Sequence, residues 1–212
     1  MRRQALCAIF VWLMMGAAAL ALPAYAEEAA TRSSEATLNN LMAEYTLRYQ
    51  LGSAEQAIPI AEQALAVAEE AFGPDDERVA QVLNDLGRLH QAQNELEPAA
   101  QLHERALKIR ERLFNGDGAA VVQSLSNLAK VYASQGRYAP AQALFERSLT
   151  IAQRHVPADA PVLLSMLEPY AAALRDGGNL EAAVAVEARI NQIRAAQPGR
   201  AGQGPSVNDV LR

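Results

Sequence analysis

Residues 78–114 read RVAQVLNDLGRLHQAQNELEPAAQLHERALKIRERLF, and residues 120–156 read AVVQSLSNLAKVYASQGRYAPAQALFERSLTIAQRHV. The second stretch repeats the first at a step of 42 residues without a gap. The same step runs from about residue 33 to about residue 193 and aligns columns such as Leu41/Leu83/Leu125/Leu167 and Ala57/Ala99/Ala141/Ala183. A period of this length indicates an array of helical units, each of which buries its apolar face only against its neighbours.

Each unit contains two stretches with apolar residues at helical spacing, which in the second unit are residues 78–93 and 97–114. The join between them is short and polar in every unit: Gly52-Ser53, Gln93-Asn94-Glu95, Gln135-Gly136-Arg137 and Gly177-Gly178-Asn179. Glycine accepts the left-handed backbone that ends a helix. Each unit is therefore predicted to be an antiparallel helical hairpin.

An aspartate column precedes the first helix of three units, at Asp75, Asp117 and Asp159. A short acceptor side chain at this place satisfies free backbone N–H groups at the start of a helix. The column therefore favours a capping or turn role over a catalytic or metal-binding one.

The repeated residues carry a family resemblance. Leu83-x2-Leu86-Gly87-x2-His90 with Ala99-x3-His103-x2-Ala106 resembles the tetratricopeptide repeat, and Leu125-x2-Leu128-Ala129-x2-Tyr132 with Ala141-x3-Phe145-x2-Ser148 resembles it more closely. The period is longer than the usual one of about 34 residues and is similar to the variant found in kinesin light chains and many bacterial proteins. The resemblance implies an all-α, right-handed superhelical solenoid of about four antiparallel hairpins that binds peptides or proteins.

The first unit departs from the pattern. Glu44 and Arg48 occupy columns that are apolar or aromatic in the next two units, while Tyr45 and Tyr49 lie one residue further on. The helix is therefore expected to be rotated or slipped relative to its counterparts.

The amino-terminal segment has the pattern of a secretory signal peptide. Arg2-Arg3 precede an apolar run from Ala5 to Leu22, and Pro23 and the small-x-small sequence Ala24-Tyr25-Ala26 follow it. Cleavage after Ala26 is expected, with Ala24 and Ala26 as the recognition residues. This predicts a periplasmic or secreted bacterial protein with no stable membrane insertion after cleavage. An uncleaved membrane anchor is the alternative, because the apolar run approaches the length of a span.

We expect four parts along the chain: a signal peptide at 1–26, a short linker at 27–34, a helical repeat domain at 35–196, and a disordered tail at 197–212, with the repeats at about 35–76, 77–118, 119–160 and 161–196. The tail is expected because residues 197–206 hold few apolar side chains and are rich in Gly and Pro. The final residues 207–212 are interpreted as a frayed end or, alternatively, a short docking motif.

Charge and cysteine content exclude several functions. The chain has 19 basic and 24 acidic residues and a net charge of −5, which argues against nucleic acid as a partner. Its one cysteine, Cys7, lies in the segment that the signal peptidase would remove. A disulfide framework and a thiol nucleophile are therefore excluded for the mature chain.

Catalysis has no positive support in the sequence. The chain lacks Gly-x-Ser-x-Gly, His-Glu-x-x-His and phosphate-loop motifs, and it has three histidines, at His90, His103 and His155. His90 and His103 align with aromatic residues of the next unit, so a packing role is the interpretation. A metal site on these two would need further ligands. We expect no enzyme activity, cofactor or metal, with a His90/His103 metal enzyme as the remote alternative.

A protein or peptide ligand is the expected partner. In the family that the chain resembles, the first helices line the inner, concave face, which implies the binding residues Asn39, Tyr49, Gln81, Asn84, Arg88, Gln91, Gln123, Asn127, Lys130 and Arg175. Arg88 and Lys130 share a column, and with Asn84 and Asn127 they are suited to an acidic side chain or a C-terminal carboxylate. The predicted function is a non-catalytic adaptor or scaffold. The alternative is a self-associating component of an envelope complex, including one anchored by an uncleaved amino terminus.

Overall fold

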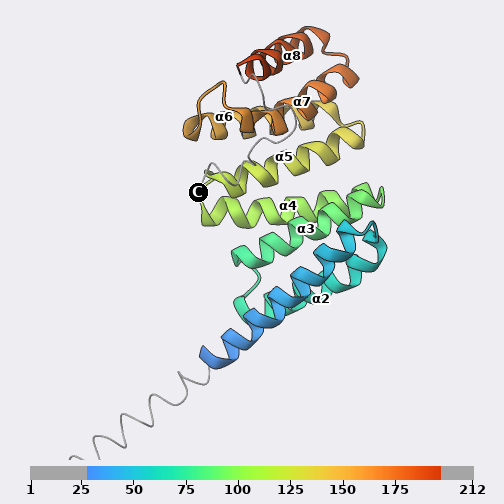
Figure 1. Cartoon of the computed structure of the whole chain (residues 1–212), viewed down its shortest axis with the longest axis vertical. Helices are drawn as coiled ribbons and strands as arrows, with labels where there is room; N and C mark the ends of the chain where they lie inside the picture. Colours follow the sequence, from blue (N-terminus) through green and yellow to red (C-terminus); the bar gives the residue numbers. More distant parts are fainter. Residues whose placement is uncertain (1–27, 197–212) are drawn as a thin grey trace, which may run out of the picture.

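The computed structural model describes residues 28–196, and this part of the chain is a stack of helices without a strand (Figure 1). The first helix is described from residue 28 to residue 50. The elements that follow are α2 (Ala54–Phe72), α3 (Glu77–Ala92), α4 (Leu96–Leu113), α5 (Ala119–Ser134), α6 (Tyr138–His155), the 3-10 turn η1 (Pro161–Leu163), α7 (Leu164–Asp176) and α8 (Leu180–Ala195). Consecutive helices pair into hairpins, and the hairpins stack in chain order. The expected signal peptide at 1–26 and tail at 197–212 lie outside the described residues.

The hairpins are held together by the columns that the sequence predicts. Ala57, Ala99, Ala141 and Ala183 are all buried, and so are Leu83, Leu125 and Leu167. Helix α5 packs on α3 and α4 of the preceding hairpin, and α7 packs in the same way on α5 and α6. The first helix of each of these hairpins therefore covers the seam between the two helices before it.

Left-handed residues occupy the same position in all four joins. Gly52, Gly136 and Gly178 have φ angles of 77°, 73° and 81°, and Asn94 takes this place in the second hairpin with φ 61°. Asparagine tolerates this region better than most side chains. The predicted role of the joins is thereby confirmed.

The aspartate column lies in the turns before the first helices, as predicted, while the cap of α3 is the next residue. Asp76 and not Asp75 caps α3, since its carboxylate accepts a hydrogen bond of 2.9 Å from the Arg78 backbone N–H. Asp75 instead pairs with Arg112 at the end of α4. Asp75 thus has the turn role of the two roles predicted, and the cap lies one residue further on, a difference that the repeat pattern does not resolve.

Asp117 likewise closes its hairpin, because its carboxylate contacts Arg154 at 3.2 Å and His155 at 2.9 Å at the end of α6. It also accepts a hydrogen bond of 2.7 Å from the Gly118 N–H, which is the expected turn contact. The hydrogen bond from His155 is the main reason why the pKa of Asp117 lies below its usual value. At Asp159 the following turn η1 has no side-chain cap.

The first helix has the rotated register that its sequence indicates. Tyr45 is buried while Glu44 is exposed. The Tyr45 hydroxyl donates a hydrogen bond of 2.9 Å to the Asp85 carboxylate of α3. Burial, followed by the Asp85 charge, raises the pKa of Tyr45 well above its usual value.

A buried histidine lies in the middle of the stack. The His103 ring is fully buried against Gly87, where an added Cβ would lie only 2.8 Å from the ring Cε1. Neither ring nitrogen has a hydrogen-bond partner among the described residues. Burial and the positive charges of Arg88, Arg110 and Lys130 lower the pKa of His103 from 6.5 to about 4. His103 is thus a neutral packing residue at pH 7.

Acid should destabilise the protein through His103. Because its pKa is lower in the folded state than in the unfolded chain, the unfolded chain takes up the proton between pH 6.5 and about 4. We expect this group to remove about 3 kcal/mol from the free energy of unfolding across that range. The variant His103→Phe, which copies Phe145 of the next hairpin, should lose this contribution. Urea unfolding at a series of pH values measures how the free energy of unfolding changes with pH in the parent and in the variant. An equal change in both proteins would contradict the lowered pKa of His103.

Candidate functional site

The candidate site lies on the surface formed by the first helix, α3, α5 and α7, called here the first-helix face. Its centre is the cation column on neighbouring helices, Arg88 in α3 and Lys130 in α5. The Arg88 guanidinium donates a hydrogen bond of 3.2 Å to the Asp85 carboxylate and lies 5.5 Å from the centre of the Tyr49 ring. Arg88 therefore already has an anionic partner.

Lys130 differs from Arg88 in this respect. Its side chain is partly buried, and its ammonium forms no ion pair or hydrogen bond within residues 28–196. Burial, and then the positive charge of Arg88, lower the pKa of Lys130. A partly desolvated cation beside a second cation is suited to an anion from another molecule.

Asn84 is not the exposed contact that the sequence predicts. It is only 2% exposed, and its side-chain oxygen accepts a hydrogen bond of 2.9 Å from the Asn127 amide. The pair links α3 to α5, and each asparagine lies about one helical turn before the cation of its own helix. Asn84 therefore positions Asn127, which is itself partly exposed.

Gln123 is engaged by a residue that sequence reasoning missed. Arg110 of α4 is 3% exposed and donates to the Gln123 side-chain oxygen at 3.1 Å, to the Ser124 hydroxyl at 3.0 Å and to the Ala120 carbonyl at 3.3 Å. It also forms an ion pair with Glu77 at 3.0 Å. The sequence could have pointed to Arg110, because the same repeat position holds alanine at Ala68 and Ala152.

A small pocket of about 60 Å³ adjoins Arg88 between the first helix and α3. Sequence reasoning placed Tyr49 and Arg88 here but missed the rest of the lining, which is Tyr45, Thr46, Asp85 and Leu89. The pocket provides aromatic and aliphatic surface next to a charged pair. It can take a small side chain of a ligand whose acidic group lies at the cation column.

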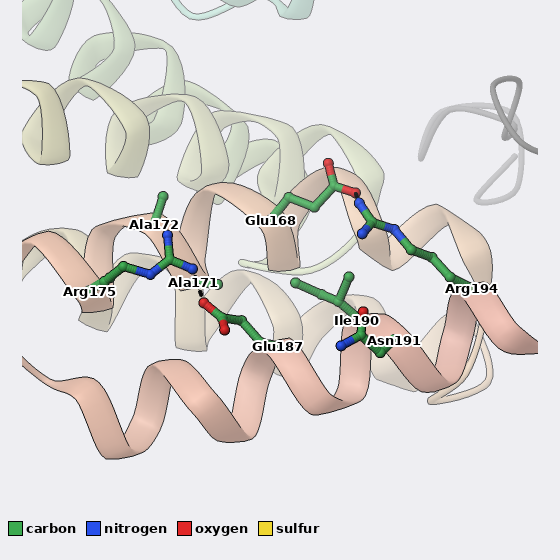
Figure 2. Close-up of a pocket in the computed structure, with 8 residues that line it drawn as sticks. All are labelled: Glu168, Ala171, Ala172, Arg175, Glu187, Ile190, Asn191 and Arg194. Carbon is green, nitrogen blue, oxygen red and sulfur yellow. Dashed lines mark hydrogen bonds and ion pairs between the residues drawn. The ribbon is translucent and has the colours of Figure 1, made fainter.

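The remaining predicted contacts are spread along the array. Asn39 and Gln81 are exposed and Gln91 is partly exposed, and within the described residues their side chains form no hydrogen bond. Arg175 lies at the other end of the array, where it pairs with Glu187 of α8 (Figure 2). The structure thus groups Tyr49, Arg88, Asn127 and Lys130, and leaves Arg175 in a separate site.

The histidines have separate surroundings. His90 Nδ1 lies 2.5 Å from a Glu95 oxygen, His103 is in the core, and His155 contacts Asp117. Within residues 28–196, no three His, Cys, Asp or Glu side chains come together in a way that could hold a metal ion. The helices described there also lack the combination of length and hydropathy that a membrane span requires.

Comparison with known proteins identifies the class. The sequence pattern of the tetratricopeptide repeat matches residues 33–112 and 99–154, which together make up more than half of the chain. The chain belongs to the tetratricopeptide repeat family. No curated protein matches it. The family relation predicted from the sequence is confirmed.

Solved structures show the same architecture. The crystal structure of BtubC (BKLC) from P. vanneervenii is similar with a TM-score of 0.69 and 25% identity, covering 79% of this chain and 67% of that one. A kinesin light chain-type protein with nearly identical TPR-like repeats from Podosopora anserina is similar with a TM-score of 0.66 and 19% identity, covering 77% of each chain. A single-residue variant of that fungal protein has a TM-score of 0.67 and 19% identity, covering 75% of each. The right-handed superhelical solenoid of helical hairpins is thus confirmed.

Lys130 should titrate below the usual lysine pKa of 10.5. Replacing Arg88 with Gln should raise the pKa of Lys130, because one of the two causes of the shift is removed while burial remains. The chain has only two lysines, Lys108 and Lys130, so NMR titration of ¹³C-labelled lysine follows both, and Lys108→Arg assigns the signals. An unchanged Lys130 pKa in Arg88→Gln would show that the two cations are not coupled.

Proposed function

We propose that this protein is an exported, non-catalytic adaptor that binds an acidic segment or a C-terminal carboxylate of a peptide or protein on its first-helix face. Tetratricopeptide repeat proteins are generally non-catalytic scaffolds for protein–protein interaction. The observation that carries the proposal is the partly buried Lys130 ammonium, which lacks an anionic partner within residues 28–196 and lies within the electrostatic reach of Arg88.

A peptide with a carboxylate next to Lys130 and Arg88 fits this face for three reasons. It supplies the negative charge that Lys130 lacks and relieves the repulsion between Lys130 and Arg88. The side chain next to it can enter the pocket lined by Tyr45, Tyr49 and Leu89. Exposed amides such as Gln81 can hydrogen-bond the backbone of an extended peptide.

The overall negative charge means that an acidic ligand is attracted to the cation column and not to the protein surface as a whole. The chain is acidic, with a net charge of −5, so a polyanion such as nucleic acid is repelled by most of the surface. A short acidic segment meets only the cation column. The proposed ligand is therefore a single carboxylate, or a few, within a protein or peptide.

Reversing the two charges should abolish binding. Affinity capture from an envelope extract with the parent chain is expected to yield a partner that Arg88→Glu combined with Lys130→Glu loses. The parent's capture should also weaken as salt rises, because added salt shortens the distance over which the cations attract an acidic ligand, which is about 8 Å at physiological ionic strength.

The matched control is Lys108→Glu combined with Arg112→Glu, which makes the same change of charge on α4 of the second hairpin. This variant should capture the partner as the parent does. Circular dichroism checks that both variants are folded. If both lose the partner equally, or neither does, the cation column is not the binding site.

The exported location rests on the sequence of residues 1–26. We expect protein recovered from a bacterial host to begin at Glu27, because the Ala24-Tyr25-Ala26 pattern directs signal peptidase to the bond after Ala26. Intact mass and amino-terminal sequencing measure this. The variant Ala24→Arg with Ala26→Arg should remain uncleaved, and recovery of the parent with Met1 in place would favour the membrane-anchored alternative.

A further inference from the structure

We propose that the surface formed by α7 and α8 at the carboxyl-terminal end of the array is a docking surface for a second copy of this chain. This surface, called here the end face, is separate from the cation column and does not depend on the proposed peptide site. It would make the protein a dimer joined through its last hairpins, with one first-helix face on each copy.

The end face occupies the place where another hairpin would stack. In α6, the residues Phe145, Leu149 and Ala152 are buried. The residues at the same repeat positions in α8 are Glu187, Asn191 and Arg194, and within residues 28–196 no further hairpin packs on them. The seam between α7 and α8 therefore corresponds to the seams that α5 and α7 cover earlier in the array.

The end face keeps apolar surface despite these polar replacements. Leu180 is 61% exposed and Val184 is 65% exposed. Their counterparts in α4 are Ala100, which is buried in a hydrophobic core shared with the third hairpin, and Leu96, which is partly buried and packs against that core. The same positions thus contribute to stacking in an internal hairpin and face solvent in the last one.

A groove runs between α7 and α8 on this face, with a volume of about 310 Å³ (Figure 2). Ala171, Ala172 and Ile190 line its apolar part. An ion pair bridges the groove near each end, Arg175 with Glu187 at one and Glu168 with Arg194 at the other, where the contact is 2.7 Å.

The four charges form a square in which neighbouring corners have opposite signs. Along α7 the order is Glu168 then Arg175, and along α8 it is Glu187 then Arg194. A two-fold axis that lies in the face and runs along the groove brings Glu168 of one copy onto Arg194 of the other, and Arg175 onto Glu187. An axis across the groove brings Glu168 of one copy onto Arg175 of the other, and Glu187 onto Arg194. In both cases every arginine of one copy meets a glutamate of the other.

This self-complementarity identifies a second copy as the occupant, because a two-fold interface pairs one patch with itself. The existing ion pairs are on the surface, with the arginines 55% and 57% exposed, so exchanging them between copies costs little. The charges select the arrangement, and burial of Leu180, Val184 and the groove stabilises it.

At the opposite end of the array, the described residues are more polar at the positions that correspond to an internal seam. Ser124, Leu128 and Val131 of α5 are buried against the preceding hairpin, and the first helix has Asn40, Glu44 and Leu47 at these repeat positions. Glu44 also forms an ion pair of 2.9 Å with Arg48. Asn40 and Glu44 make this end more polar than an internal seam, and Leu47 is 56% exposed there. The self-complementary charges of the end face therefore favour a closed dimer over a head-to-tail filament.

The test is sedimentation equilibrium of the mature chain, which begins at Glu27, at concentrations up to about 100 μM. The parent should have the mass of two copies. Val184→Arg should weaken dimerisation about a hundredfold, because two valines leave the interface and two new charges enter it. The matched control, Leu47→Arg, places the same side chain at an exposed position on the opposite end and should remain dimeric.

Charge reversal tests the square itself. Reversing all four corners, with Glu168→Arg, Arg175→Glu, Glu187→Arg and Arg194→Glu, keeps the self-complementary pattern and should still dimerise. A mixture of this variant with the parent should contain few mixed dimers, because like charges then meet at every corner. The double variant Arg175→Glu with Glu187→Arg should dimerise only if the axis runs along the groove.

Several results would overturn the proposal. A parent chain that stays at the mass of one copy would do so, as would a dimer that Val184→Arg leaves intact. If the monomeric parent becomes dimeric once residues 197–212 are removed, the tail and not a second copy occupies the end face. Free mixing of the parent with the four-corner variant would show that the charges do not select the partner.

Discussion

The structure depends on close approach of the two helices in each hairpin, which the alanine column Ala57, Ala99, Ala141 and Ala183 permits. A larger side chain there would separate the helices and leave voids that a small domain has little energy to tolerate. Because a hairpin buries apolar surface only against its neighbours, this local constraint propagates along the array. The stack is stable only when successive hairpins present matching seams.

The second and third hairpins fill the same two repeat positions with different pairs of residues. Gly87 and His103 occupy the columns that hold Ala129 and Phe145 in the next unit, so a smaller residue on one helix accommodates the ring on the other. Nearby, the buried Arg110 is neutralised by Glu77 and by oxygens of α5. The seam between these hairpins is therefore unusually rich in polar groups, and Lys130 lies at its edge.

The two ends of the array have different chemistry for the same physical reason. Any terminal hairpin exposes positions that are buried in the interior. At the amino-terminal end these positions include the polar Asn40 and Glu44 and the exposed Leu47, whereas at the carboxyl-terminal end Leu180 and Val184 are exposed beside two ion pairs that bridge a groove. An array whose carboxyl-terminal end has this charge pattern can combine a ligand-binding face with a contact to another molecule.

The sequence by itself determined the period, the hairpins, the left-handed joins and the placement of Arg88 and Lys130 in one column, because each follows from local helical spacing repeated in register. Only the tertiary structure decided that Asn84 is buried against Asn127, that Arg110 engages Gln123, and that Arg175 pairs with Glu187. These contacts join side chains on different helices. They depend on the rotation of each helix about its axis and on the angle at which hairpins stack, and a repeat pattern specifies neither.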